Sequence, residues 1–181
     1  MNASSYLPAQ SLRSVYIEPA ESPIDYQRAA LAYWQAKRGE RFAPGWADIA
    51  LMDFPLHVIP VLVVTDINPQ TFEMSYRFWG TKLTETHGHD YTGQSPKDLM
   101  PKLLGQGSTT AYRELLEKKV PQLEIKEFYR GNELRGRQMV LRLPLSDDGR
   151  NVTKSLNVTY QETAGNARPH SEFFDYVLAS V

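Results

Sequence analysis

The chain has 181 residues, of which 20 are Lys or Arg and 21 are Asp or Glu, a formal net charge of -1, and it contains no Cys. Near-neutral charge excludes binding that depends on neutralising many phosphates, and the lack of Cys excludes disulfide scaffolds, thiol nucleophiles and thiolate-held iron–sulfur clusters. With 41% of residues hydrophobic, one domain with terminal extensions can build a core.

The N-terminal part predicts an arm followed by a helix. Residues 1–22 show no hydrophobic period, so we expect an arm or a loosely docked lead-in. A helix over residues 23–38 follows, because Ser22 can cap it and Pro23 suits its first position. Gly39 ends this helix directly after two basic residues.

Two strands and a short helix come next in the pattern. Residues 61–67 are an apolar run that predicts a buried strand, and residues 71–79 alternate between large apolar and polar side chains. The turn signal between them predicts a hairpin. Residues 81–87 are then long enough for a short helix, which Gly88 stops.

The second half predicts one longer helix and a meander of strands. Residues 89–107 are rich in Gly and Pro and indicate loops, after which Ser108 caps a helix over residues 108–120. Three strands follow the long helix, at 123–129, 138–145 and 152–160. The short apolar tail 173–181 is expected to pair or pack against the sheet edge. This order favours an α+β fold with an antiparallel sheet and helices on one face.

The longest apolar stretch, residues 58–64, is far shorter than the roughly 20 residues that cross a bilayer. The first residues also lack the basic and apolar regions of a secretory signal. The sequence therefore predicts a cytoplasmic protein with no membrane and no nucleic acid among its partners.

Several short segments, in order and spread over residues 24–160, are similar to the PAS sensory fold. They resemble in particular the bacterial stand-alone PAS subfamily first catalogued as a domain of unknown function. The segments are Tyr33-Trp34-Gln35-Ala36-Lys37-Arg38-Gly39, Ala47-Asp48-Ile49, Phe54-Pro55, Tyr76-Arg77-Phe78-Trp79-Gly80-Thr81, Gly88-His89-Asp90-Tyr91-Thr92-Gly93-Gln94 and Arg142-Leu143-Pro144-Leu145-Ser146-Asp147-Asp148-Gly149.

The resemblance implies a five-stranded antiparallel sheet in the order 2-1-5-4-3, with helices on one face and an N-terminal flanking helix. We therefore divide the chain into an arm (1–22), a PAS-like domain (23–160) that includes the helix 23–38, and a C-terminal extension (161–181). Many PAS domains bind a small molecule between helices and sheet, while others bind none and serve as dimerisation modules. The subfamily supplies no catalytic motif or ligand residue to transfer.

A candidate ligand pocket follows from the alternation in the strands and the spacing in the helices. It would be mostly apolar, with tyrosine hydroxyl groups to orient a small apolar or aromatic ligand. The alternative is that these side chains simply fill the core. The candidate residues are Tyr76, Phe78, Leu83, Tyr112, Leu116, Leu141 and Leu143.

A candidate dimer interface lies on the N-terminal helix, where Ile24, Leu31 and Trp34 share one stripe. In many PAS relatives this helix forms the dimer contact. The alternative is that the stripe packs onto the protein's own sheet. Expected partners are a small-molecule ligand and either a second copy of the chain or a separate signalling protein.

No metal site or cofactor is identified from the sequence. His87-Gly88-His89-Asp90 is the only cluster of metal-ligating types, and we interpret it as an exposed turn. Gly105-Gln106-Gly107-Ser108 could offer backbone N–H groups to a phosphate, but helix capping explains it better. Without Cys, the resemblance leaves no flavin adduct or thioester-linked chromophore, and the lack of His in 108–120 argues against haem.

The leading hypothesis is a non-enzymatic sensor or protein-interaction module that signals through a partner or a dimer. The alternative is a small cone-shaped α+β enzyme, such as an isomerase or dehydratase, with an acid or base in its cavity. The strand faces expected to point inward are mainly apolar, and Glu127, near a break in the alternation, is the exception to examine.

Overall fold

The computed structural model describes residues 11–164 and 173–178. The first ten residues of the predicted arm, and residues 165–172 and 179–181 of the predicted C-terminal extension, lie outside the described residues. The strands are β1 (Ser11–Ile17), β2 (Leu62–Ile67), β3 (Met74–Trp79), β4 (Gln122–Arg130), β5 (Glu133–Leu145) and β6 (Lys154–Thr163). The helices are α1 (Asp25–Arg38), α2 (Thr81–His87), α3 (Lys102–Lys118) and α4 (Phe173–Leu178).

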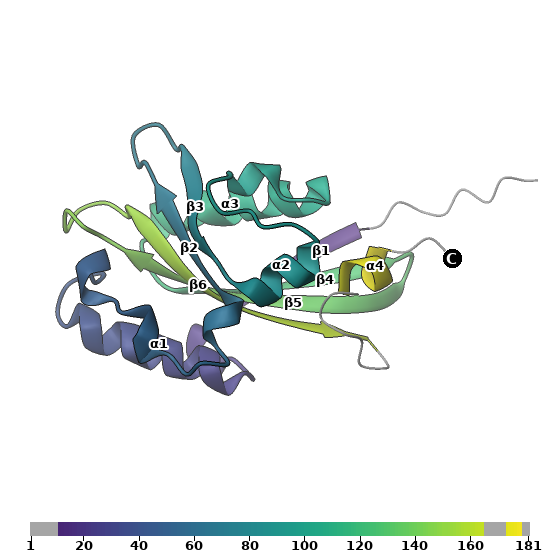
Figure 1. The fold of residues 1–181 in the computed structure, drawn as a ribbon, viewed down its shortest axis with the longest axis horizontal. Coiled ribbons are helices and arrows are strands. Elements are labelled where there is room, and N and C mark those ends of the chain that lie inside the picture. The colour runs from purple at the N-terminus through teal and green to yellow at the C-terminus, as the bar shows by residue number, and fades with distance from the viewer. Residues whose placement is uncertain (1–10, 165–172, 179–181) are drawn as a thin grey trace, which may run out of the picture.

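The six strands form one antiparallel sheet in the order β1-β4-β5-β6-β2-β3 (Figure 1). Counted from the predicted first strand, the five strands from β2 to β6 stand in the expected order 2-1-5-4-3, so the α+β fold prediction is confirmed. The sixth strand, β1, pairs with β4 at the edge and lies within the lead-in, where the sequence pattern indicates no strand.

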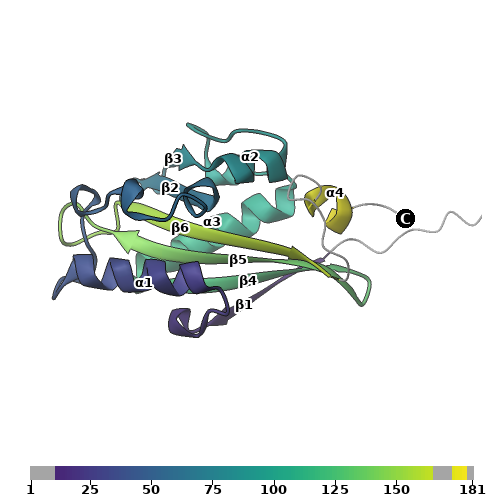
Figure 2. The ribbon, with the colours of Figure 1, turned by 60° about the horizontal axis from the view of Figure 1, so that its bottom comes forward.

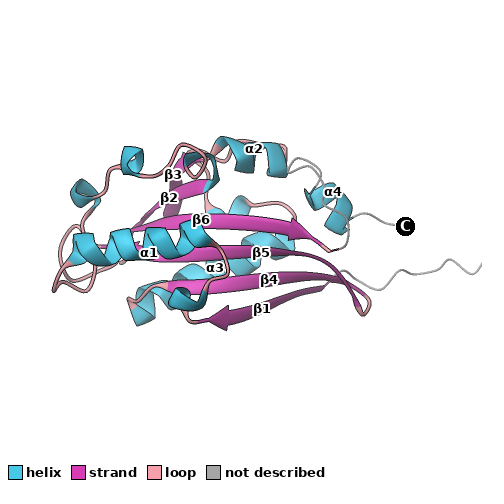
Figure 3. Ribbon diagram, turned by 90° about the horizontal axis from the view of Figure 1, so that it is seen from below, coloured by secondary structure: helices cyan, strands magenta, loops and turns pink. Residues whose placement is uncertain are grey.

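Helices lie on both faces of the sheet. Helix α1 covers one face, and α2, α3 and α4 lie on the other (Figure 2). The view from below in Figure 3 shows α1 in front of the central strands and α3 behind them. The central strands are therefore buried on both sides, which explains why both alternating sets of their residues are sheltered from solvent.

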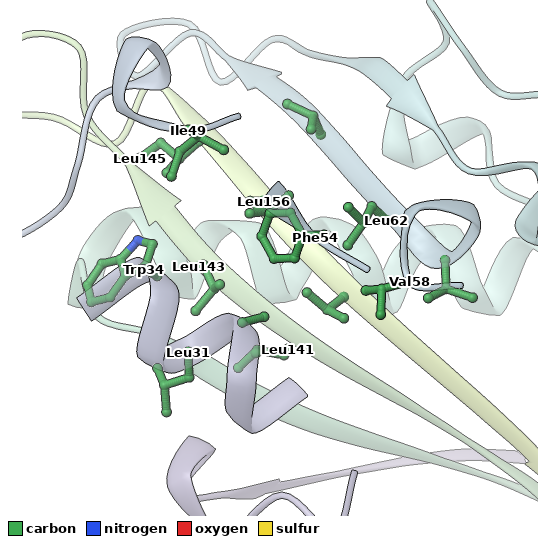
Figure 4. Packing of buried hydrophobic residues seen from close by; sticks show 14 of the residues in the cluster. Leu31, Trp34, Ile49, Phe54, Val58, Leu62, Leu141, Leu143, Leu145 and Leu156 are labelled. Atoms are coloured by element: carbon green, nitrogen blue, oxygen red, sulfur yellow. The ribbon is translucent and has the colours of Figure 1, made fainter. Parts of the chain in front are cut away.

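The face under α1 holds the main apolar core. Figure 4 shows Leu31 and Trp34 of α1 lying over Leu141 and Leu143 of β5. Trp34 is only 2% exposed, and its indole Nε1 donates a hydrogen bond to the carbonyl oxygen of Pro144 at 2.7 Å. Gln27 of the same helix donates from Nε2 to the carbonyl oxygens of Met139 at 3.2 Å and Val158 at 2.8 Å. Apolar burial and these buried hydrogen bonds fix helix α1 to its own sheet.

Helix α1 ends at the predicted position but begins at Asp25, two residues later than predicted, and its N-cap position is Ile24, so Ser22 is not the cap. Ser22 Oγ accepts a hydrogen bond from the Ile24 amide at 3.1 Å and donates one to Gln27 Oε1 at 2.7 Å. The chain leaves the helix at Gly39 with a φ of 55°, a value that glycine adopts without the penalty of a side chain.

Helix α3 differs from its prediction, because it begins at Lys102 and not at Ser108. Ser108 is 4% exposed and lies inside the helix, so it cannot act as a cap. Gly105 brings the helix against the 3-10 turn Pro96–Asp98: a Cβ there would lie 2.8 Å from the Lys97 carbonyl oxygen. The glycine therefore serves close packing and does not mark a loop.

Helix α4 packs on the sheet, as expected for the apolar tail. Phe173, Phe174 and Val177 are buried together with Phe128 of β4. The Phe174 ring also contacts the His87 ring at the end of α2 in a tilted arrangement, with 4.6 Å between ring centroids. No helix in the described part of the chain has the length and apolar character needed to span a membrane.

Candidate ligand cavity

A small cavity of about 40 Å³ lies between the sheet and helices α2 and α3. Its walls have two characters. The apolar side includes Val63, Leu83 and Leu104, and the polar side is supplied largely by strands β4, β5 and β6. The polar side includes Lys126, Gln138, Arg142, Asn157 and Thr159, all of which are buried.

Three ionisable side chains meet on this side of the sheet. Arg142 Nη1 donates a hydrogen bond to Glu124 Oε2 at 2.6 Å, and Lys126 Nζ lies 3.6 Å from the same oxygen. Each of the three side chains is at most 2% exposed. One carboxylate therefore faces two cations in the interior, where an unbalanced charge is costly.

Further hydrogen bonds fix this cluster to neighbouring elements. Ser14 Oγ on the edge strand β1 donates a hydrogen bond to Glu124 Oε1 at 2.7 Å, the oxygen that Arg142 does not contact. Lys126 Nζ donates to Ser108 Oγ on α3 at 3.2 Å. Strand β1 and the helical position of Ser108 both differ from the sequence prediction, and both contact the charged groups of the site.

The buried environment shifts two pKa values strongly. Burial lowers the pKa of Lys126 to about 8, against the opposing attraction of Glu124. Burial also acts to raise the pKa of Glu124, but the charges of Lys126 and Arg142 outweigh it and hold that pKa at about 2. At neutral pH the cluster therefore carries two positive charges and one negative charge.

A second network centres on Tyr112 of α3. Its hydroxyl group accepts a hydrogen bond from Asn157 Nδ2 at 2.7 Å and shares another with Thr65 Oγ1 at 2.6 Å. The Arg142 guanidinium group lies 5.5 Å from the centre of the Tyr112 ring. These contacts hold α3 against β2, β5 and β6 and orient the polar wall of the cavity.

Two buried donors that belong to the cavity lining have no hydrogen-bond partner in the described part of the chain. They are Nε of Arg142 and the indole Nε1 of Trp79. Buried donors without partners are rare, and leaving one unsatisfied costs on the order of 1–3 kcal/mol. A bound molecule with acceptor atoms would be a suitable partner for such donors.

The structure brings together only part of the predicted pocket. Tyr76, Leu83 and Tyr112 line the cavity as expected. Phe78, Leu141 and Leu143 do not, because they lie on the opposite face of the sheet with α1, and Leu116 packs in a separate cluster with Tyr112 and Leu115. These four residues are removed from the candidate site, and ligand binding at the other three stays a prediction.

A β-bulge explains why Tyr76 and Phe78 separate. Val64 of β2 pairs with Phe78, but the next residue, Thr65, pairs with Tyr76, so one extra residue enters β3 between these two pairs. The bulge reverses the alternation, and two residues that would share a face in a regular strand point to opposite faces. On β5 the alternation is regular, and the cavity faces Val140 and Arg142, not the leucines between and beside them.

The predicted dimer stripe on α1 lies inside the protein's own core. Leu31 and Trp34 are buried against the sheet, and Ile24 is partly buried beside them. The alternative stated for this stripe, that it packs on its own sheet, is the arrangement observed. A contact between two copies would have to use other residues, and the oligomeric state stays a prediction.

Other motifs have structural roles in the fold. His87 packs against the Trp79 ring at 5.1 Å between centroids, while Asp90 Oδ1 accepts the Thr92 amide at 2.8 Å and closes a turn. Within residues 11–164 and 173–178, no three His, Asp or Glu side chains are grouped so that they could hold a metal ion. Glu127, the acid to examine, pairs with Arg137 at 3.1 Å away from the cavity lining.

The charged residues of the site were not predicted from the sequence. Glu124 and Lys126 alternate along β4, and Gln138 and Arg142 stand on one face of β5. Such alternation is typical of a strand with one face in solvent, and here α3 covers that face. A signal was nevertheless present, because three neighbouring strands each place polar residues on the same side of the sheet.

Comparison with known proteins gives one family match. A family model described as PAS domain matches residues 25–156, most of the chain. A search of curated proteins finds no match. The matched region includes α1, both cationic residues of the cavity, strands β2 to β5 and the first three residues of β6.

Proposed function

The chain belongs to the PAS domain family, whose members are in general sensor or interaction modules, and on this premise we propose that it is a non-enzymatic input module for a small ligand. The ligand would occupy the cavity between the sheet and helices α2 and α3. The observation that carries this proposal is the buried polar wall, which places two cations and two unpartnered donors of the described residues around one internal space.

The polar wall changes the expected ligand. The sequence predicted a small apolar or aromatic molecule, but Lys126 and Arg142 line the cavity beside the apolar residues. A ligand that satisfies these groups must carry polar acceptor atoms. We therefore keep the predicted location of the ligand and drop the expectation of a wholly apolar one.

A signal could reach the rest of the molecule through α3. This helix contacts the charged cluster through Ser108 and the second network through Tyr112. A ligand that binds one position of α3 better than another would shift the equilibrium between them. We propose that a second copy or a separate signalling protein reads this shift; a cytoplasmic location remains a prediction of the sequence.

The enzyme alternative expected an acid or base in the cavity. Glu127, the residue singled out for examination, is paired with Arg137 outside the cavity lining, whereas His87 and Lys126 do line the cavity. PAS domains are generally sensor modules without catalytic activity. We therefore do not carry the isomerase or dehydratase proposal further.

Native mass spectrometry of the freshly purified protein, compared with its denatured mass, tests the proposed function. We expect an extra mass in the native state, in proportion to the chain, that is lost on denaturation. The same spectrum gives the oligomeric state. A native mass that is a whole multiple of the chain mass, with nothing added, would contradict a retained ligand. A dimer without ligand would favour a module that works only through protein contacts.

A further inference from the structure

We propose that the cavity binds the carboxylate of a short monocarboxylate, with Lys126 and Arg142 as its counter-charges. This inference rests on the proposed function, because it names the chemical class of the ligand at the same site. It begins from the charges that meet on the polar wall, two cations against the single carboxylate of Glu124.

The charge of the cluster favours a monoanion. Glu124 already neutralises one positive charge, and Ser14 and Arg142 hold it through both of its oxygens. One cation is therefore left without a compensating charge in the described interior. A bound monoanion would balance it, whereas a dianion would leave an excess negative charge in a buried place.

Two residues that line the cavity carry buried hydrogen-bond donors without a partner among the described residues. These donors are Arg142 Nε and Trp79 Nε1. Lys126 carries three N–H groups, and its contacts are the Ser108 hydroxyl group and the Glu124 carboxylate. A carboxylate offers only acceptors, so it matches this set better than an amide or an alcohol does.

The size and the apolar wall limit the rest of the ligand. A volume of about 40 Å³ exceeds the roughly 10–15 Å³ that one water needs, and is suited to formate or acetate but not to a nucleotide. Val63, Leu83 and Leu104 face the remaining space, where a methyl or ethyl group can pack. The site thus fits a carboxylate with one to three carbon atoms.

The affinity should depend on pH in a defined direction. Lys126 faces Glu124 on its own strand, Arg142 on β5, and Ser108 and Tyr112 on α3, while His87 of α2 also lines the cavity. Because burial lowers the pKa of Lys126 to about 8, its positive charge is lost as the pH rises through that value. Anion binding is therefore strongest below about pH 8 and weakens above it.

Isothermal titration calorimetry of the whole chain at pH 6.5 and constant ionic strength tests the inference. The probes are sodium formate, acetate and propionate, with acetamide as an uncharged molecule of acetate's shape and sodium chloride as a simple anion. We expect one-to-one binding of acetate, and binding of acetamide at least about tenfold weaker. At pH 9.5 acetate should bind about tenfold more weakly or worse.

Two lysine variants complete the test. Lys126→Met should weaken acetate binding at least about tenfold, while Lys82→Met, at an exposed position of α2, should leave it unchanged. Lys126→Arg retains the charge and should restore part of the affinity. Should Lys126→Met fail to fold, the comparison of pH 6.5 with pH 9.5 on the unmodified chain decides the same question.

Four results would overturn the inference: no acetate binding, equal affinity for acetamide, equal affinity for chloride, or an unchanged affinity in the folded Lys126→Met protein. If acetate fails to bind while native mass spectrometry shows a retained neutral molecule, the proposed function stands and only the ligand class is wrong. If neither acetate nor any retained mass is found, both proposals fail.

Discussion

Lys126 lowers the stability of the fold, because its side chain is only 1% exposed and lies near a second cation, Arg142. Burial of an ammonium group is unfavourable even with one carboxylate nearby. The same cost of burying the charge lowers the pKa of Lys126 to about 8. Residues kept at such a cost are typical of functional positions, where stability and function compete.

We expect Lys126→Met to stabilise the protein by about 1–3 kcal/mol at neutral pH, since it leaves Glu124 and Arg142 as a neutral pair. The folded pKa of about 8 lies below the ordinary value of 10.5, so the stability of the unmodified protein should rise between these pH values relative to the variant. Urea unfolding measures both effects, with Lys82→Met as the exposed control. A variant less stable than the original would show that Lys126 contributes to the fold itself.

Replacing Glu124 should lower the stability of the protein, whereas replacing Lys126 should raise it. The Glu124→Gln variant leaves Lys126 and Arg142 without a counter-charge, and we expect a loss of about 3–5 kcal/mol. The exposed Glu117→Gln is the matched control and should cost almost nothing. Urea unfolding at pH 7 compares the two; equal stability of both variants would contradict the buried charged cluster.

The loss of folding stability at low pH should also depend on Glu124. Its folded pKa of about 2 lies below the ordinary 4.5, so its contribution is complete above about pH 4.5 and is lost as the pH falls towards 2. Unfolding curves across this range should fall steeply for the unmodified protein and less steeply for Glu124→Gln. Parallel curves would show that the carboxylate is not stabilised in the folded state.

At the scale of single residues, the sequence predicted well which side chains are buried. It predicted only in part which face of the sheet each side chain points to. The alternation along β5 correctly separated Leu141 and Leu143 from Arg142. It could not show which set faces α3, because both faces of the sheet are covered. The position of Tyr76 relative to Phe78 depends on a bulge in β3, which pairing with β2 creates and the local sequence does not mark.

Helix α1 is held to the sheet mainly by its buried apolar side chains, among which Trp34 is the largest. We expect Trp34→Ala to destabilise the protein by about 3–5 kcal/mol, because it leaves a cavity and an unpartnered Pro144 carbonyl group. Gln35→Ala, on the exposed side of the same helix, should have little effect. Thermal unfolding and light scattering distinguish the two views of this stripe: dissociation of a dimer without loss of stability would favour the interface first predicted from the sequence.

Two glycines of α3 provide a matched pair at the scale of elements. Gly105→Ala should destabilise the protein, because its Cβ would lie 2.8 Å from the Lys97 carbonyl oxygen. Gly107→Ala meets only a Leu12 methyl carbon at 3.4 Å and should stabilise the helix by up to about 1 kcal/mol. Thermal unfolding shows whether each change stabilises or destabilises the protein. Equal effects of the two changes would contradict the close packing of α3 on the turn before it.

The elements themselves were predictable where period and boundary signals agreed. Helix α1 and strand β2 follow from such signals, and α2 begins and ends where expected. The start of α3 was not predictable, since Gly105 and Gly107 indicate a loop when read locally. Strand β1 was missed because its pairing with β4 is a contact between distant parts of the chain.

The whole molecule is a sheet with two unlike faces. The face under α1 is apolar and gives the protein its main core, while the face under α3 carries buried charges and hydrogen-bonding groups. The family resemblance predicted the strand order and the place of a ligand between sheet and helices. It could not give the chemistry of that space, which depends on the side chains of this chain alone.

The most direct measurement uses the indole N–H signals of the three tryptophans in ¹H–¹⁵N spectra during a titration with sodium acetate. Trp79 lines the cavity, whereas the Trp34 indole is bonded to Pro144 on the opposite face and Trp46 lies outside the cavity lining. We predict that the Trp79 signal shifts and saturates while the other two stay in place. A shift of Trp34 with Trp79 unchanged, or no shift at all, would contradict a ligand site on the polar face of the sheet.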